Sequence, residues 1–201
     1  MRKHLSAIFL ISALVMAAPA SARSNFQSTV EAPLSGAVKL EVVIGEELAY
    51  RAENLPKKLS DRGSSSRFSR GFGKNGNYGV RDVARLQARL ERKVTAQFAR
   101  KGITLSDSAP TVLRVTLTNA KPNRPTIEQL SKEPGLSYSS FGLGGAEIEA
   151  ELVSAGGQSL GNMQYRFYED DIRDAAFSGT WTDAYRSFDR FARKAAKQLA
   201  S

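Results

Sequence analysis

The chain has 201 residues, with 29 Lys and Arg against 20 Asp and Glu, one His and no Cys. Its start has the layout of a secretory signal peptide, in which a basic segment, an apolar run and a small-residue cleavage site follow one another. The three parts are Arg2-Lys3-His4, residues 5–18 and Ala20-Ser21-Ala22. We therefore expect residues 1–22 to be removed by cleavage near Ala22, and the protein to be periplasmic or secreted.

Removal of Arg2 and Lys3 lowers the formal charge from +9 to +7, and the expected mature chain has neither His nor Cys. This composition excludes Ser-His-Asp and Cys-His nucleophiles, His/Cys zinc sites, disulfides and thiol redox chemistry. We expect no cofactor. Without a Cys at the cleavage point no lipid anchor is expected there, and without a second long apolar run no membrane span is expected.

The remaining length fits one domain, which we expect to occupy residues 37–201 after a flexible segment at 23–36. Alternating apolar residues predict a first strand at 38–44. A long irregular segment rich in Gly, Ser and Arg follows at about 54–79, and segments of this length inside a domain usually carry function or are disordered. Residues 80–101 have the clearest helical pattern, with Asp82 in the first turn and Gly102 as the stop signal.

Strands are predicted at 111–118, 146–154 and 159–169, the last two joined by the turn Ala155-Gly156-Gly157-Gln158. The spacing of Thr126 and Gln129 predicts a capping box that starts a short helix. A final helix is predicted at 182–200, with Thr180 or Thr182 as its cap and Trp181 as a core residue. The order strand, helix, strand, strand, strand, helix indicates an α+β fold, a mainly antiparallel sheet with two main helices on one face.

The helix at 80–101 also gives the candidate binding surface. At 100° per residue its basic side chains fall within an arc of roughly 120° beside the apolar stripe. Arg side chains match phosphate and carboxylate geometry, and the neighbouring Gly-rich segment would leave backbone N–H groups free for an anion. The candidate anion- or partner-binding residues are Arg67, Arg70, Lys74, Arg81, Arg85, Arg89 and Arg92. A solvated helix face paired with Glu residues is the alternative interpretation.

Several other motifs favour ordinary interpretations. Gly71-Phe72-Gly73-Lys74-Asn75-Gly76 fits the G-x-G-x-x-G pattern but lacks the preceding strand that a dinucleotide site requires. The Arg, Gly and Phe residues of 67–79 are similar to nucleic-acid-binding segments, yet export makes a physiological nucleic-acid partner unexpected. Asp170, Asp171 and Asp174 follow Glu169 without the spacing of a calcium-binding loop, so no metal site is expected.

Glu147, Glu149 and Glu151 alternate along one predicted strand. Paired carboxylates hydrolyse glycosides when a cleft separates their pKa values, whereas a regular exposed row offers no cleft. We expect a solvated strand face, with Arg166 across the hairpin as an ion-pair partner. A carboxylate-dependent hydrolase of an envelope glycan remains the alternative function, and a purely structural envelope-assembly factor is a third.

The layout resembles a loose group of small exported domains of unknown function in Gram-negative bacteria, many of them lipoproteins. The resemblance covers Thr111–Thr118, Gly144–Leu152 and Ala184–Ala200. It implies an envelope-associated α+β domain and no catalytic residues. Together with the charge pattern, it leads us to expect a non-enzymatic protein that binds an anionic lipid, lipopolysaccharide, an acidic glycan or an acidic protein. The oligomeric state is not predicted.

Overall fold

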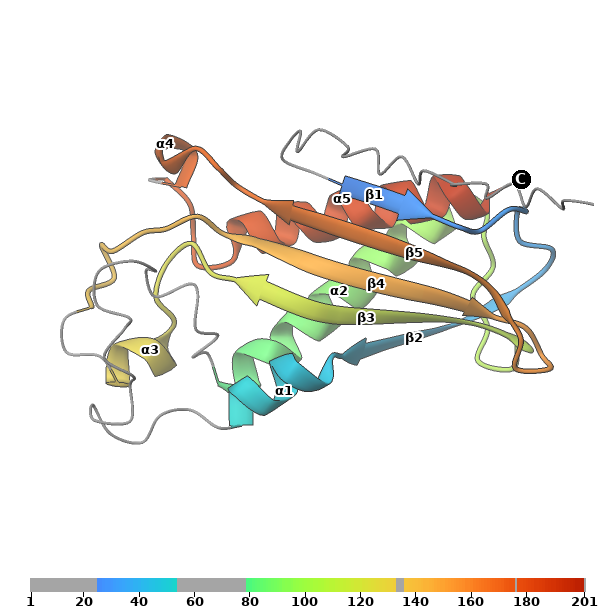
Figure 1. Ribbon diagram of the computed structural model, residues 1–201, viewed down its shortest axis with the longest axis horizontal. Helices are drawn as coiled ribbons and strands as arrows, with labels where there is room; N and C mark the ends of the chain where they lie inside the picture. Colours follow the sequence, from blue (N-terminus) through green and yellow to red (C-terminus); the bar gives the residue numbers. More distant parts are fainter. Residues whose placement is uncertain (1–24, 54–78, 133–135, 176, 201) are drawn as a thin grey trace, which may run out of the picture.

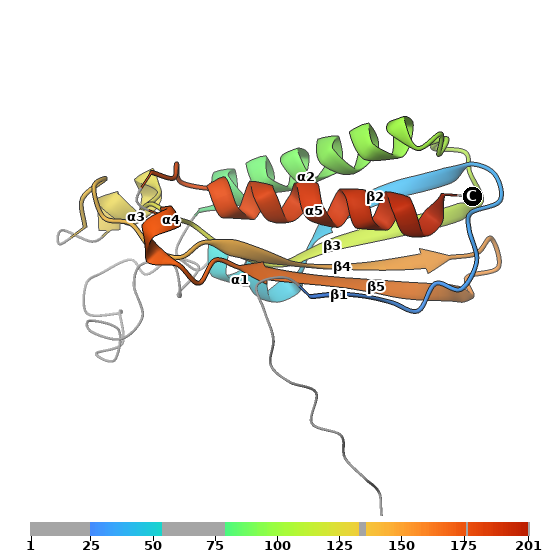
Figure 2. The ribbon, with the colours of Figure 1, turned by 90° about the horizontal axis from the view of Figure 1, so that it is seen from above.

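The computed structural model describes residues 25–53, 79–132, 136–175 and 177–200. Within these residues, one five-stranded sheet in the order β1-β5-β4-β3-β2 has two long helices side by side on one face (Figures 1 and 2). The strands are β1 (Asn25–Ser28), β2 (Val38–Ile44), β3 (Thr111–Lys121), β4 (Gly145–Val153) and β5 (Ser159–Tyr168). The helices are α1 (Glu46–Glu53), α2 (Val80–Arg100), α3 (Ile127–Lys132), α4 (Ile172–Ala175) and α5 (Thr182–Leu199). The predicted α+β class is confirmed.

The sheet is mainly antiparallel, as predicted, with one exception. β1 with β5, β5 with β4 and β4 with β3 pair antiparallel, whereas β2 and β3 pair parallel. Parallel neighbours require a crossover between them, and α2 supplies it on the covered face of the sheet. The order strand, helix, strand therefore forms a βαβ unit beside an antiparallel meander.

The core lies between the sheet and the two long helices. Five apolar residues that recur at spacings of three and four along α2 are buried: Val83, Leu86, Leu90, Val94 and Phe98. They face the buried side chains of the strands, such as Leu113 and Ile148, and the aromatic side chains Phe188 and Phe191 of α5. β3 and β4 alternate buried and more exposed residues over most of their length, so the apolar spacing of strands and helix together indicates most of this core.

The N-terminal segment differs from the expectation. Residues 23–36 were predicted as flexible, but Asn25–Ser28 form the edge strand β1, and Val30 is buried. The reason is backbone pairing with β5, extended by hydrogen bonds from Gln198 Nε2 to the Val30 carbonyl (2.9 Å) and from the Leu34 N–H to the Leu199 carbonyl (2.9 Å). The expected signal peptide at 1–22 and nearly all of the irregular segment at 54–79 lie outside the described residues.

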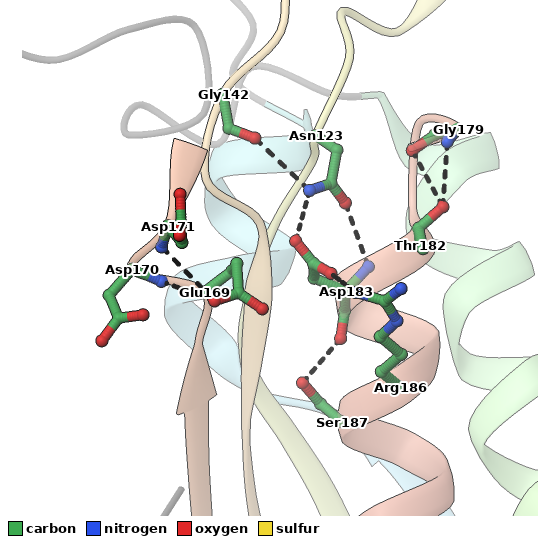
Figure 3. A network of polar contacts seen from close by, with 10 residues as sticks. All are labelled: Asn123, Gly142, Glu169, Asp170, Asp171, Gly179, Thr182, Asp183, Arg186 and Ser187. Carbon is green, nitrogen blue, oxygen red and sulfur yellow. Dashed lines mark hydrogen bonds and ion pairs between the residues drawn. The ribbon is translucent and has the colours of Figure 1, made fainter. Parts of the chain in front are cut away.

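A buried amide joins three segments where α5 begins (Figure 3). Asn123 has no exposed surface; its Oδ1 accepts the Asp183 N–H (3.0 Å), and its Nδ2 donates to the Asp183 carboxylate and to the Gly142 carbonyl (3.3 Å). Its backbone N–H donates to the Thr180 carbonyl (2.7 Å). Asn123 therefore caps α5 from a distant loop, and the expected cap by Thr180 or Thr182 was wrong, because the Thr182 hydroxyl accepts the Gly179 N–H instead (2.9 Å).

The neighbouring Arg124 holds the same loops through their carbonyl groups. Its Nε donates to the Ser178 carbonyl (2.9 Å), and its Nη1 donates to the carbonyls of Tyr138 (3.3 Å) and Ser139 (3.1 Å). The predicted capping box follows directly, with the Thr126 N–H donating to Gln129 Oε1 (2.9 Å) and the Gln129 N–H to Thr126 Oγ1 (3.2 Å). We call this region, formed by α3, α4 and residues 136–144 and 177–181, the loop end.

We predict that Asn123→Ala lowers the free energy of unfolding by roughly 2–4 kcal/mol, because it leaves a helix N–H without a partner and removes one of the two donors, the other being Arg186, to the buried Asp183 carboxylate. Chemical denaturation measures this change. Asn162→Ala on the exposed face of β5 is the control, with an expected change within about 0.5 kcal/mol. Equal losses in the two variants would contradict the capping role of Asn123.

Candidate functional site: the basic helical layer

Charge is divided unequally between the two layers of the molecule. α2 and α5 carry eleven Lys and Arg against four Asp and Glu, whereas the five strands carry four of each. The helical layer thus has a formal charge of +7 and the strands have none. Because both helices bury one stripe against the sheet, most of the excess cations point outward.

Three of the predicted arginines stand on the outer surface of α2. Arg81, Arg85 and Arg92 are exposed, and no described side chain forms a hydrogen bond or ion pair with Arg81 or Arg92. Arg85 lies near the carboxylate of Asp82, one turn before it. The periodicity of the sequence therefore placed these three correctly on one accessible surface.

The inner part of the predicted arc is used for packing between the helices. The Arg89 guanidinium lies 5.1 Å from the ring centroid of Tyr185 on α5 and is half-buried. Lys93 pairs with Asp189 of α5, with 2.8 Å from Nζ to Oδ1. These contacts join α2 to α5, so Arg89 is less available to a ligand than its position in the sequence predicted.

Helix α5 adds cations that the sequence analysis did not select. A shallow groove of about 450 Å³ between the helices is lined by Gln97, Arg100, Arg186, Asp189, Arg190 and Arg193. Arg186 pairs with Asp183 (3.1 Å) and Arg190 lies 4.4 Å from the Phe167 ring centroid, whereas Arg100 and Arg193 have no described ion-pair partner. The sequence contained a pattern that indicates these cations, since Arg186 and Arg193 lie seven residues apart and opposite the buried stripe of α5.

Arg67, Arg70 and Lys74 lie outside the described residues, so the structure does not place them beside the helical layer. The candidate anion-binding site therefore consists of exposed arginines on two adjoining helices. Arginines of this kind bind phosphate and carboxylate groups through paired N–H donors, and their charges add over a surface.

Where α2 begins, a carboxylate is partly withdrawn from water. Burial raises the pKa of Asp82, and the charge of Glu128 on α3 adds to this. A hydrogen bond from Trp181 and the charge of Arg85 act in the opposite direction and do not cancel the effect of burial. Trp181 itself is 8% exposed, which confirms its predicted place in the core.

The opposite face of the sheet is polar and balanced in charge. Glu147, Glu149 and Glu151 lie on this face as predicted, and Glu147 pairs with Arg166 (Oε1 to Nε, 3.2 Å). Hollows of about 180 and 320 Å³ meet at Glu149 and Gln164. Because the three carboxylates stand in a row along one strand, the arrangement offers no facing pair for glycoside hydrolysis.

Within the described part of the chain, no group of three or more His, Cys, Asp and Glu side chains is arranged to hold a metal ion. No helix there is long and apolar enough to cross a membrane.

Comparison with known proteins gives distant structural likenesses. No protein-family model matches the chain, and no curated protein matches it. A PelC dodecamer from Paraburkholderia phytofirmans, solved as a single-residue variant, has 10% sequence identity and a TM-score of 0.45, over 88% of this chain and 98% of the other. A PelC dodecamer from the same organism in a second crystal form has 9% identity and a TM-score of 0.41, over 89% and 99%. We therefore argue function from the residues of this chain.

We predict that Asp82→Asn gains stability relative to the unsubstituted protein as pH rises from about 3 to about 7. The folded state holds the proton of Asp82 more tightly than the unfolded state, whose pKa is near 3.8. The unsubstituted protein therefore loses the stability that protonated Asp82 contributes as pH rises through this interval, and the variant has no such contribution to lose. Urea unfolding at both pH values measures the difference. Glu91→Gln, which removes an exposed carboxylate of the same helix, should show no comparable trend; the same trend in both variants would contradict the effect of burial.

Proposed function

We propose that this protein is a non-enzymatic periplasmic factor that binds an anionic component of the cell envelope, or an acidic partner protein, through its basic helical layer. The division of charge between the layers carries the proposal. A net charge needed for solubility would be spread over both faces, whereas here the strands are balanced and α2 and α5 hold the excess. The signal-peptide pattern at 1–22 supports an envelope location.

The side chains fit ligands that present several phosphates or carboxylates. Arg81, Arg85 and Arg92 project from one helix, and Arg100 and Arg193 lie at the shallow groove beside it. A wide, open surface of this kind suits a repeated anionic ligand better than a single small molecule, which needs an enclosed pocket. Anionic lipid headgroups, lipopolysaccharide phosphates, acidic glycans and acidic proteins share this chemistry.

The alternative functions find less support in the described residues. A glycan hydrolase would need two carboxylates facing each other across a cleft, and the Glu row on β4 is open and partly neutralised by Arg166. A purely structural assembly factor would be expected to show an apolar patch on the open sheet face. That face instead carries Arg114, Glu149, Gln164 and similar side chains.

We predict that the Arg85→Glu/Arg92→Glu variant binds anionic vesicles of phosphatidylcholine and phosphatidylglycerol at least about thirtyfold more weakly than the unsubstituted protein. Each Arg near such a surface contributes roughly 1 kcal/mol, and the introduced Glu residues add repulsion. Vesicle sedimentation measures binding to the lipid, and the salt concentration that elutes the protein from heparin resin measures binding to an acidic glycan.

The matched control is Arg114→Glu/Arg166→Glu, which makes the same change in net charge on the open sheet face. Both arginines are accessible, with 51% and 71% of their side chains exposed. We expect this control to retain most of the binding. An equal loss in the two double variants would show that net charge alone is responsible and would contradict a site on the helical layer.

A further inference from the structure

Large apolar side chains are concentrated at the loop end. Phe177 is 98% exposed, Ile127 81% and Tyr138 62%, and Phe141, Leu143 and Ile172 are exposed as well. They stand on separate segments that the fold ties together: Arg124 binds carbonyls of residues 138, 139 and 178, and the Glu169 N–H donates to the Gly144 carbonyl (2.9 Å). α3 and α4 lie at this same end of the molecule (Figure 1). Large exposed apolar side chains gathered at one end of a molecule indicate an interaction surface.

Tyr138, Phe141, Leu143 and Phe177 stand on loops that are free of charge, whereas Ile127 and Ile172 stand on short helices that contain charged residues. Residues 136–146 and 175–182 contain no Asp, Glu, Lys or Arg, in a chain that is 24% charged overall. Moving the tips of these loops out of water would therefore require no ionised side chain of these segments to be desolvated, which is the largest cost of entering a less polar medium.

Several backbone polar groups of these loops are also hydrogen-bonded within the protein. In lipid, each backbone polar group without a partner costs several kcal/mol. Here Arg124 satisfies three carbonyls, Asn123 binds the Gly142 carbonyl through Nδ2, and the Gly142 N–H donates to the Asn123 carbonyl (2.9 Å). The side chains that fix the loops thus also satisfy polar groups close to their tips.

We infer that the loop end inserts into the interface of a phospholipid bilayer, with Phe177 and the aromatic side chains of residues 136–144 as its contact. The arginines where α2 and α5 begin do not make this end basic, because Arg186 pairs with Asp183 and the segment of α4 adds Glu169, Asp170, Asp171 and Asp174. The contact is therefore the apolar and aromatic side chains, a residue type that the membrane interface favours. A fluid bilayer accepts single protruding side chains on separate loops, whereas a second protein would need a complementary packed surface. This goes beyond the proposed function, because the contact is apolar and does not depend on the helical layer.

The test uses the full chain with Phe177→Ser, and vesicles of phosphatidylcholine alone and with phosphatidylglycerol, each at low and high salt. We expect Phe177→Ser to weaken sedimentation with both kinds of vesicle by about fivefold to tenfold, including at high salt, since an apolar contact is not screened. The side chain is almost fully exposed, so thermal unfolding should be unchanged. Leu160→Ser, which removes a half-exposed apolar side chain at the β4–β5 turn, is the control and should bind as the unsubstituted protein does.

A second readout locates the contact. In the Phe177→Trp variant, fluorescence should shift to shorter wavelength on adding vesicles and be quenched by bromine-labelled lipid chains, beyond the response of Trp181 in the unsubstituted protein. Absence of this response, unchanged vesicle binding by Phe177→Ser, or an equal loss in Leu160→Ser would overturn the inference. Loss of concentration-dependent self-association in Phe177→Ser, with lipid binding intact, would also overturn it and indicate a second copy as the occupant.

The two proposals fail separately. If Arg85→Glu/Arg92→Glu leaves anion binding unchanged while Phe177→Ser still weakens vesicle binding at high salt, the proposed binding by the basic helical layer is wrong and the loop-end inference is supported. If Phe177→Ser has no effect but the double Arg variant loses salt-sensitive binding, the loop-end inference is wrong and the proposed binding by the basic helical layer is supported.

Discussion

The structure depends on the covering of one apolar sheet face by two amphipathic helices. β3 and β4 bury every second side chain on that face, and α2 and α5 bury their apolar stripes against it. A helix that buries one stripe must expose its other surface, and in this chain that surface is rich in arginine. The open sheet face meets water and carries charges that balance. The charge is therefore distributed unequally because the helices, and not a second sheet, cover the apolar sheet face and expose their arginine-rich surfaces.

The two helices are fixed to each other and to the loops at one end. Arg89 with Tyr185 and Lys93 with Asp189 join them side by side in the same direction. Asn123 then connects the start of α5 to the loop that follows β3, and its exclusion from solvent makes this connection costly to remove. These contacts consequently join the arginine surface to the apolar loop end.

Local patterns predicted the local structure well. The apolar spacing of three and four residues from Val83 to Phe98 and the capping box at Thr126 depend on residues close in sequence, so both were predictable. The polar strand β1 has no such pattern, because its position is set by backbone pairing with β5. For the same reason the cap of α5 was missed: Asn123 acts sixty residues away from Asp183. At the candidate site, periodicity placed Arg81, Arg85 and Arg92 on the surface but could not show that α5 shares the site.

The most direct test of the account is arginine footprinting with phenylglyoxal, read by mass spectrometry in the absence and presence of anionic vesicles. We predict that Arg81, Arg85, Arg92 and Arg193 are protected when vesicles are present, while Arg114 and Arg166 on the open sheet face react at unchanged rates. Protection spread equally over both layers, or confined to the sheet face, would contradict the claim that the helical layer is the anion-binding surface.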